Sequence, residues 1–278
     1  MSLLKGIDQF IEDIQLRRKD RVIRTVTSNF RQLPDIIIIG AQKSGTTSLF
    51  NYLEQHPQIV GSKPKEVHYF DINYEYGTLW YRSHFPLKSN LLALEASPYY
   101  ICHPHAPKRI YNLLPNVRLI AILRNPVERA ISHYFHQVRT GSEKLPIFDA
   151  LKNEEVRLKT SWENMVADEM YNNRNHQRFS YKQRGVYIEQ LERFWKFFDS
   201  RNLLVLNSEK LFTQPNKALS EIFGFLEVDS SVKEIDLKKY TVGVNREKVS
   251  PEVYDYLTEF FKPFNERLYE RIGEDFGW

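Results

Sequence analysis

The sequence predicts one α/β domain over residues 1–278, with a central parallel sheet and helices on both faces. Four short apolar runs are the strand candidates, and they lie at residues 36–40, 91–95, 117–123 and 202–206. The first contains four consecutive isoleucines, Ile36 to Ile39, which suits a strand buried on both faces. No repeat, low-complexity tract or Gly/Ser linker divides the chain, and 278 residues is a normal length for one such sheet.

Composition narrows the function classes. Hydrophobic residues make up 42% of the chain and aromatic residues 14%, which is enough to fill a sizeable core. The 39 Lys and Arg exceed the 35 Asp and Glu by a net charge of +4, without long basic runs. This balance suits an anionic small molecule better than nucleic acid. The single cysteine, Cys102, excludes an internal disulfide and indicates a reducing compartment.

No apolar run approaches the ~20 residues of a membrane span, and no signal core is seen. A cytoplasmic protein is therefore expected. The first 33 residues are interpreted as a helical extension, with a helix predicted over residues 3–18 and lying across the fold. Its apolar positions recur at helical spacing and are Leu3, Leu4, Ile7, Phe10, Ile11 and Ile14.

The first strand runs into a glycine-bounded loop, Gly40-Ala-Gln-Lys-Ser-Gly-Thr-Thr47. Gly40 ends the strand, and the residues after Gly45 begin a helical pattern. Such a loop points backbone N–H groups and the positive end of a helix dipole at one spot. Lys43 adds a full positive charge, so the loop predicts a phosphate-like ligand.

This loop differs from the nucleoside triphosphatase pattern G-x-x-x-x-G-K-[ST], because Thr46 follows the second glycine and the lysine lies inside the loop. A triphosphatase also needs an aspartate at the end of a second apolar strand to help hold Mg²⁺. Here the later strand candidates run into Arg124 and Asn207. These departures weigh against ATP with magnesium.

The loop resembles the 5′-phosphosulfate-binding loop of sulfotransferases that use 3′-phosphoadenosine-5′-phosphosulfate (PAPS) and release PAP. The resemblance implies a P-loop-type fold, no metal, and PAPS as the donor. It also implies that the cofactor contacts come from Gly40, Gln42, Lys43, Ser44, Gly45, Thr46 and Thr47.

A second segment, Lys65-Glu66-Val67-His68-Tyr69-Phe70-Asp71, resembles the K-E-x-H-F-F-D stretch of carbohydrate sulfotransferases, including the heparan sulfate enzymes. In that family the glutamate is the proposed catalytic base. Sulfuryl transfer to a hydroxyl needs a group that removes the acceptor proton and cations that stabilise the leaving oxygen. Glu66 suits the first role and Lys43 the second, and His68 is expected to act as a second base or to orient Glu66.

The third strand candidate ends in Arg124-Asn-Pro-Val-Glu-Arg-Ala-Ile-Ser132, which is similar to the family's R-[ND]-P-x-x-R-x-x-S element. By this resemblance Arg124 and Ser132 bind the cofactor's 3′-phosphate, for which a guanidinium offers a planar fork of donors. Arg129, in the same element, is expected to pair on the helix surface.

Two further elements extend the resemblance. Arg184-Gly185-Val186-Tyr187 resembles the R-G-x-Y element that helps to hold the nucleotide. Arg246 and Lys248 precede a long amphipathic helix expected from Pro251. They occupy the place where family members close a basic loop over the 3′-phosphate, although a solvated loop is equally compatible with the sequence.

The acceptor side is less defined. Ser97-Pro98-Tyr99-Tyr100 resembles the family's [ST]-P-x-Y element near the acceptor. Heparan sulfate 3-O enzymes carry lysine just before it, where this chain has Glu95-Ala96, and a carboxylate there would repel an anionic glycosaminoglycan. Residues 141–182 are interpreted as an acceptor-side insert or lid. The aromatic residues proposed to line the acceptor site are Tyr69, Tyr99, Tyr100 and Trp162.

Together these features predict a sulfotransferase that moves the sulfuryl group of PAPS directly to a hydroxyl of a carbohydrate, lipid or other small metabolite. Two alternatives remain at this point: a P-loop small-molecule kinase using ATP, and a non-catalytic nucleotide-binding protein. The missing magnesium aspartate weighs against the first, and Glu66 in its K-E-x-H setting weighs against the second. His103 and His105 lack Cys or carboxylate neighbours at ligand spacing, so no metal site is expected.

Overall fold

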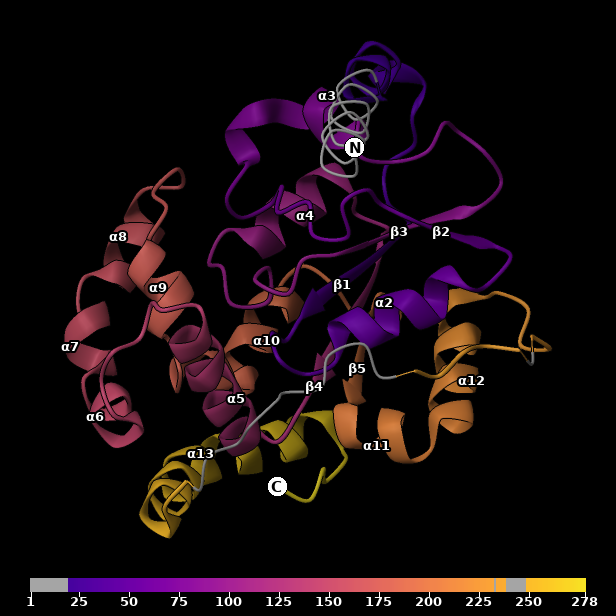
Figure 1. The fold of residues 1–278 in the computed structure, drawn as a ribbon. Coiled ribbons are helices and arrows are strands. Elements are labelled where there is room, and N and C mark those ends of the chain that lie inside the picture. The colour runs from indigo at the N-terminus through magenta and orange to yellow at the C-terminus, as the bar shows by residue number, and fades with distance from the viewer. Residues whose placement is uncertain (1–19, 233, 239–248) are drawn as a thin grey trace, which may run out of the picture.

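The computed structural model describes residues 20–232, 234–238 and 249–278. Its centre is a five-stranded parallel sheet in the order β2-β3-β1-β4-β5 (Figure 1). The strands are β1 (Ile36–Gly40), β2 (Ile59–Gly61), β3 (Leu92–Ala96), β4 (Arg118–Leu123) and β5 (Leu203–Asn207). The predicted parallel sheet and its four strands are confirmed, and β2 is an additional short strand at one edge.

Strand β1 lies at the middle of the sheet, which explains its sequence. Ile36 pairs with Leu94 of β3 on one side and with Arg118 of β4 on the other. All four isoleucines are fully buried. A strand covered on both faces has no polar side, so an uninterrupted apolar run is the sequence that fits it.

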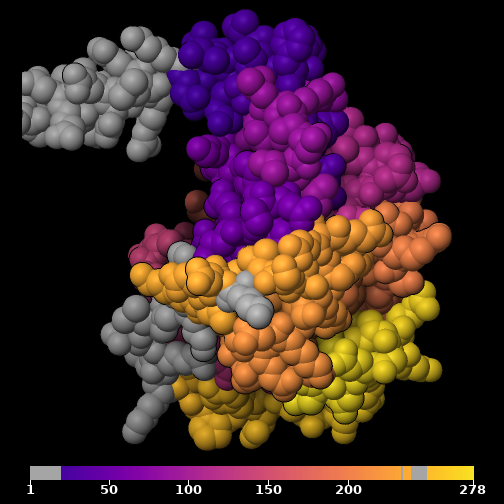
Figure 2. All heavy atoms as spheres, turned by 90° about the vertical axis from the view of Figure 1, so that its right-hand side faces the viewer, coloured from indigo at the N-terminus to yellow at the C-terminus, as the bar shows by residue number. Residues whose placement is uncertain are grey.

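Helices cover both faces of the sheet, as predicted. Ile37 and Ile39 face a large core formed with α4 (Ala106–Leu113), α5 (Pro126–Arg139), α10 (Tyr187–Trp195) and α13 (Pro251–Ile272). Ile36 and Ile38 face a smaller core formed with α2 (Thr46–Glu54), α11 (Ser208–Thr213) and α12 (Pro215–Leu226). Figure 2 shows the side where α12 lies between the N-terminal third of the chain and α13.

The segment predicted as an insert, residues 141–182, consists mainly of short helices. They are α6 (Ile147–Lys152), α7 (Glu154–Leu158), α8 (Ser161–Ala167) and α9 (Arg174–Phe179). Ala150, Leu151 and Met165 are buried against the larger core, so the segment packs on the sheet's helical layer.

The chain is also helical at residues 20–26. Four short elements remain. They are η1 (Ser28–Phe30), η2 (Tyr74–Tyr76), α3 (Gly77–Arg82) and η3 (Gln183–Gly185). The helix expected over residues 3–18 lies outside the described residues. Within the described part of the chain, no helix has the length and apolar character needed to cross a bilayer.

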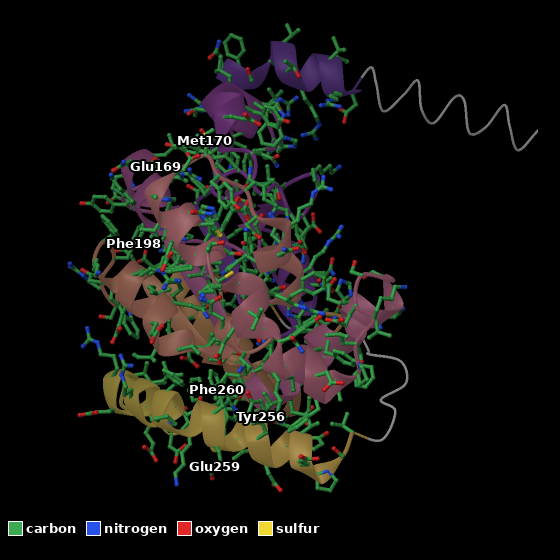
Figure 3. The ribbon with its side chains drawn as sticks, turned by 90° about the vertical axis from the view of Figure 1, so that its left-hand side faces the viewer. Glu169, Met170, Phe198, Tyr256, Glu259 and Phe260 are labelled. Atoms are coloured by element: carbon green, nitrogen blue, oxygen red, sulfur yellow. The ribbon has the colours of Figure 1, made fainter. Side chains whose placement is uncertain are left out.

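The long amphipathic helix expected from Pro251 is α13. Val253, Leu257 and Phe261 are buried along one side of it. Figure 3 shows Tyr256 and Phe260 on the side of α13 that faces the protein, with Glu259 on the opposite side. The apolar side of α13 therefore covers the larger core.

The strand order also determines where a ligand can bind. From the central β1 the chain crosses to β2 at one edge and returns to β3, whereas β4 leads to β5 on the other side of β1. Loops leaving the carboxyl ends of β1 and β4 therefore diverge, and a crevice opens between them.

Candidate active site

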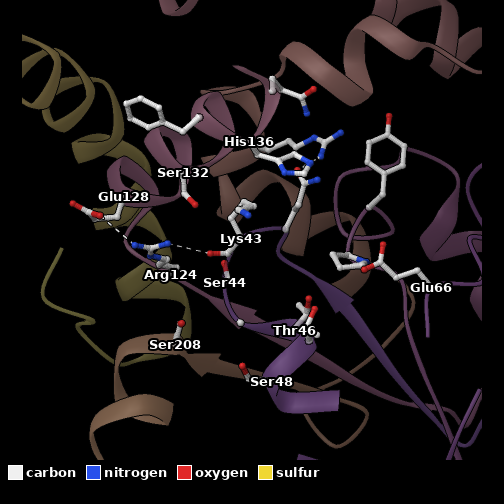
Figure 4. Close-up of a pocket in the computed structure, with 18 of the residues that line it drawn as sticks. Lys43, Ser44, Thr46, Ser48, Glu66, Arg124, Glu128, Ser132, His136 and Ser208 are labelled. Atoms are coloured by element: carbon white, nitrogen blue, oxygen red, sulfur yellow. Dashed lines mark hydrogen bonds and ion pairs between the residues drawn. The ribbon is translucent and has the colours of Figure 1, made fainter. Parts of the chain in front are cut away.

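A cleft of about 1260 Å³ lies at the carboxyl ends of β1, β4 and β5. Segments far apart in the sequence supply its walls (Figure 4). The predicted site residues that line it are Gln42, Lys43, Ser44, Gly45, Thr46, Thr47, Glu66, His68, Arg124, Ser132 and Arg184.

The loop after β1 forms the floor of the cleft, and Gly45 fixes its shape. Gly45 is the N-cap of α2 and has φ +95°, a left-handed conformation that costs little for glycine alone. A Cβ atom at this position would lie 2.8 Å from the ring of Phe212, so space also requires glycine. The first turn of α2 therefore presents the N–H groups of Thr46, Thr47 and Ser48 to the cleft.

Positive charges converge above this floor. Burial lowers the pKa of Lys43, and the nearby charges of Arg139 and Arg124 lower it further. Burial likewise lowers the pKa of His136, with added repulsion from Lys43 and Arg139. Both shifts arise from burial together with repulsion between neighbouring positive charges, and an anionic ligand would relieve that repulsion.

Arg124 lies at the end of β4, where it joins the loop to α5. Its Nη1 atom donates to the carbonyl oxygen of Lys43 at 3.3 Å, and its Nη2 atom pairs with Glu128 at 3.2 Å. The side chain is 22% exposed toward the cleft. Asn125 caps α5 by accepting hydrogen bonds from Val127 N and Glu128 N, which starts the helix that carries Ser132 into the cleft.

At the other end of the cleft, Glu66 belongs to a chain of charged groups. Lys65 Nζ donates to Thr47 Oγ1 at 2.9 Å and pairs with Glu66 at 2.8 Å. His68 Nε2 lies 3.3 Å from the second oxygen of Glu66, and His68 Nδ1 lies 2.8 Å from Asp71. In Figure 4 Glu66 and Arg124 lie on opposite sides of the cleft with Lys43 between them.

These contacts determine the protonation states of Glu66 and His68. Burial raises the pKa of Glu66, but hydrogen bonds from His68 and Lys65 outweigh it and bring the pKa to about 2. Burial lowers the pKa of His68, yet hydrogen bonds to Asp71 and Glu66 raise it to about 10. At neutral pH Glu66 is therefore ionised and able to accept a proton, while His68 is a cation that holds Glu66 in place.

Three predicted cofactor residues, Gly40, Gly185 and Tyr187, do not line the cleft. Gly40 is the last residue of β1. The close approach at Gly185 is to Phe261 of α13, since a Cβ there would lie 2.6 Å from its ring. The Tyr187 hydroxyl donates to the carbonyl oxygen of Arg124 at 2.9 Å, so it supports the cleft from behind.

Arg184 lines the cleft, but most of its N–H groups donate hydrogen bonds to other groups of the protein. Its Nη1 atom donates to Gln42 Oε1 at 2.6 Å, and Nε donates to Ser180 Oγ at 2.9 Å. Its Nη2 atom donates to the carbonyl oxygen of Gln177 at 2.6 Å, and the guanidinium lies 4.6 Å above the Tyr99 ring. Arg184 thereby joins the loop after β1 to the segment that follows α9.

Two sequence expectations are wrong. Glu95 does not face an acceptor, because it is fully buried in β3 and accepts hydrogen bonds from Ser97 and Tyr100 at 2.6 and 2.7 Å and from Tyr81. Burial raises the pKa of Glu95 to about 7 even though these hydrogen bonds lower it. Arg129 does not pair on the helix surface, since it is fully buried and donates to the carbonyl oxygen of Tyr181.

The aromatic residues expected at the acceptor separate in the structure. Tyr99 lines the cleft, whereas Tyr69 and Tyr100 lie in the larger core. Trp162 lines a separate small cavity beside Cys102. Arg246 and Lys248 lie outside the described residues. No group of three His, Cys, Asp or Glu among the described residues is close enough to hold a metal ion.

The cleft also contains residues that the sequence reading missed. Its additional members from α5 and the residues just after it are Phe135, His136, Gln137, Arg139, Thr140 and Ser142. His136 and Arg139 lie four and seven positions after Ser132, so helical spacing from Ser132 could have found them. Ser208, Glu209 and Phe212 follow β5, where the rule that ligands bind at carboxyl ends of strands would have placed them.

Comparison with known proteins gives the family. The family described as "Sulfotransferase domain" matches residues 33–256. The chain belongs to the sulfotransferase family. The predicted family is thus confirmed, and so is the predicted fold: a crystal structure of a sulfotransferase from Alicyclobacillus acidocaldarius matches with a TM-score of 0.72 at 27% identity. That match covers 88% of this chain and 97% of the other.

Curated members of the sulfotransferase family are similar along most of the chain. Heparan sulfate glucosamine 3-O-sulfotransferase 3B1 of Homo sapiens is 32% identical over 279 residues, covering 90% of this chain. Membrane-associated sulfotransferase kil1 of Dictyostelium discoideum is 29% identical over 315 residues, covering 88% of this chain. The chain spans 66% of the length of each of these two relatives.

Proposed function

We propose that this sulfotransferase-family protein transfers the sulfuryl group of PAPS to an acceptor hydroxyl, with Glu66 as the base. One observation carries the proposal. The loop after β1, the Arg124–Ser132 element and the Lys65–Asp71 segment all meet in one cleft. The cleft therefore combines an anion-binding floor with an ionised carboxylate at its opposite end.

The donor set of the cleft fits PAPS. Two phosphate-like groups need cations and N–H or O–H donors, and the cleft supplies Lys43, Arg124 and Arg139 with the hydroxyls of Thr46, Thr47 and Ser132. We assign the 5′-phosphosulfate to the loop after β1 and the 3′-phosphate to Arg124 and Ser132. When bound, PAPS supplies a sulfuryl group activated by a phosphate leaving group, which departs as PAP.

The protein's own groups then have distinct tasks. Glu66 accepts the proton of the acceptor hydroxyl as the new oxygen–sulfur bond forms. Lys43 and the N–H groups at the start of α2 stabilise negative charge on the oxygen that leaves. His68 stays protonated, because its pKa is about 10, and orients Glu66 through the 3.3 Å contact. Gly40, Gly185 and Tyr187 support these groups indirectly.

We further propose a glycan hydroxyl as the acceptor. The human relative is named for glucosamine in heparan sulfate. The sequence-based objection to an anionic glycan no longer applies, because Glu95 is buried. Gln177, Arg178 and Tyr99 line the cleft beside His68 and Ile72, so the segment 141–182 contributes to the acceptor side as an insert or lid. Lipid and small-metabolite hydroxyls are the competing acceptors in a screen.

We also propose a single-domain organisation and a cytoplasmic location. We treat residues 1–278 as one sulfotransferase domain with residues 1–33 as an extension. A cytoplasmic location rests on the single cysteine, Cys102, which is a buried free thiol. Since the Dictyostelium relative is named as membrane-associated, cell fractionation is the direct test of location.

A thermal-shift titration tests the donor class. PAP should raise the melting temperature of the protein, whereas ATP with Mg²⁺ should not, because a ligand selective for the native state stabilises it. Radiolabelled PAPS incubated with a panel of glycans, lipids and small alcohols then tests transfer. Stabilisation by ATP with Mg²⁺ and indifference to PAP would contradict the proposal and favour a kinase.

A further inference from the structure

Outside the cleft, the carboxyl group of Glu95 is surrounded by a buried cluster of hydroxyl groups. Its Oε1 atom accepts hydrogen bonds from Ser97 Oγ at 2.6 Å and from the Tyr100 hydroxyl at 2.7 Å. Its Oε2 atom accepts a hydrogen bond from the Tyr81 hydroxyl. Glu95, Ser97, Tyr81 and Tyr100 are all fully buried, so water does not compete for these contacts.

Two of these hydroxyls also hold the backbone that carries His68. Ser97 Oγ accepts a hydrogen bond from His68 N at 2.9 Å. The Tyr100 hydroxyl accepts from Tyr69 N at 2.7 Å and from Phe70 N at 3.3 Å. Tyr81 contacts the same carboxylate without any hydrogen bond to a backbone N–H of this segment, although its ring stacks on Tyr69 with the centroids 4.3 Å apart.

The segment needs such support because it is irregular. Residues 66–68 belong to no helix or strand. His68 has φ +56°, a left-handed conformation that is costly for a residue with a Cβ and persists only where the surroundings enforce it. The N–H groups of residues 68, 69 and 70 do not pair with a neighbouring strand. The hydroxyls of Ser97 and Tyr100 accept their hydrogen bonds instead.

Hydrogen-bond direction makes Glu95 the organising group. A hydroxyl has one proton, so Ser97 and Tyr100 can accept from backbone N–H groups while donating that proton to one partner. Both donate to the same Oε1 atom of Glu95, which accepts both hydrogen bonds. The carboxylate thereby fixes the orientation of both hydroxyls.

We propose that Glu95, Ser97 and Tyr100 are positioning residues that hold His68, and through it Glu66, in the geometry needed for proton removal. This inference rests on the proposed function for its catalytic consequence. Its structural part, that the hydroxyls set the His68–Glu66–Asp71 contacts, stands independently of turnover.

Tyr100→Phe and Tyr81→Phe form a matched pair for the test. Both remove one buried hydroxyl that donates to Glu95 and keep the aromatic ring. Only Tyr100→Phe removes the hydrogen bonds to Tyr69 N and Phe70 N. With labelled PAPS and an active acceptor, we expect kcat to fall by about 100-fold in Tyr100→Phe with KM for PAPS unchanged, as a misplaced catalytic group would predict. Tyr81→Phe should keep kcat.

The pKa of His68 gives a readout that needs no turnover. NMR titration of the imidazole resonance, assigned with His68→Gln, should show a lower pKa in Tyr100→Phe and an unchanged pKa in Tyr81→Phe. Ser97→Ala should resemble Tyr100→Phe. Glu95→Gln keeps an acceptor oxygen for both hydroxyls and should retain the His68 pKa, whereas Glu95→Ala should not.

The two readouts separate two kinds of failure. Equal His68 pKa values in wild type, Tyr100→Phe and Ser97→Ala would overturn the positioning role, whatever the activity. An altered His68 pKa in a protein that shows no sulfuryl transfer to any acceptor would support the positioning role while counting against the proposed function. Should Tyr100→Phe fail to fold, Ser97→Ala and Glu95→Gln carry the same comparison.

Discussion

The guanidinium of Arg124 donates a hydrogen bond of 3.3 Å to the backbone carbonyl oxygen of Lys43. The two residues follow neighbouring strands, β4 and β1, at the same edge of the sheet. This contact joins the two elements of the cleft to which we assign the anionic groups of the donor. It also withdraws one loop carbonyl from the ligand side, which leaves N–H and cationic groups to face an anion.

Replacing Arg124 with alanine should weaken PAP binding by about 10- to 100-fold, since a hydrogen bond to a charged group contributes roughly 1.5–3 kcal/mol. Isothermal titration calorimetry measures the effect directly. Arg124→Lys is the control that keeps the charge without the planar fork, and it should recover only part of the affinity. Wild-type affinity in Arg124→Ala would remove Arg124 from the proposed site.

Replacing Glu66 with glutamine should lower kcat by about 10² to 10⁴, the usual contribution of a general base. The dissociation constant for PAP should stay the same, because Glu66 lies across the cleft from Arg124. Glu75→Gln makes the same change of charge at an exposed position of η2 and should leave kcat unaltered. Wild-type turnover in Glu66→Gln would exclude Glu66 as the base.

The charged cluster around His68 predicts a specific dependence of stability on pH. The folded-state pKa of His68 is about 10, above its ordinary value of 6.5. Its contribution to the free energy of unfolding is therefore complete below pH 6.5 and disappears as the pH rises toward 10. His68→Gln should destabilise the protein by about 2 kcal/mol at pH 6, after allowance for solvent screening, and by much less at pH 10.

Urea unfolding at both pH values measures this difference. The contribution of Glu66 to the free energy of unfolding has the opposite pH dependence, since its pKa of about 2 lies below the ordinary 4.5. Its contribution is present above pH 4.5 and is lost as the pH falls toward 2. Equal destabilisation by His68→Gln at pH 6 and pH 10 would show that the ion pairs contribute nothing measurable.

Replacing Gly45 with alanine should both destabilise the protein and weaken PAP binding. The added Cβ would meet the Phe212 ring at 2.8 Å, in addition to the cost of a left-handed φ. Gly141→Ala is a matched control, because Gly141 has φ +73° and nothing within 4 Å of the added atom. We expect a loss of about 1 kcal/mol for Gly141→Ala and a clearly larger loss for Gly45→Ala, measured by thermal or urea unfolding.

The features that could be predicted from sequence are those that depend on local pattern. The isoleucine run gave β1 because full burial on both faces leaves no polar position in the strand. Arg124 and the loop around Lys43 were found because each directly follows an apolar run. Strand β2 was missed because three residues, Ile59–Gly61, are too short to show a period.

Long-range contacts explain the wrong or missing expectations. The partner of Arg129 is a backbone carbonyl, at Tyr181, which leaves no trace in side-chain spacing. Glu95 was interpreted as an exposed charge because two of its hydroxyl partners, Tyr81 and Tyr100, cannot be told in the sequence from other core aromatic residues. Arg178 reaches the cleft from a segment without a readable pattern.

The central position of β1 has a consequence for how the chain folds. The apolar run Ile36 to Ile39 is synthesised before its partners, and it can pair only when Leu94 of β3 and Arg118 of β4 have been made. Such non-local pairing slows folding and leaves a β-prone segment without partners in the meantime. Nascent chains that end before β4 should therefore aggregate or recruit chaperones, and ribosome-bound chains should become protease-resistant only after β4 has left the exit tunnel.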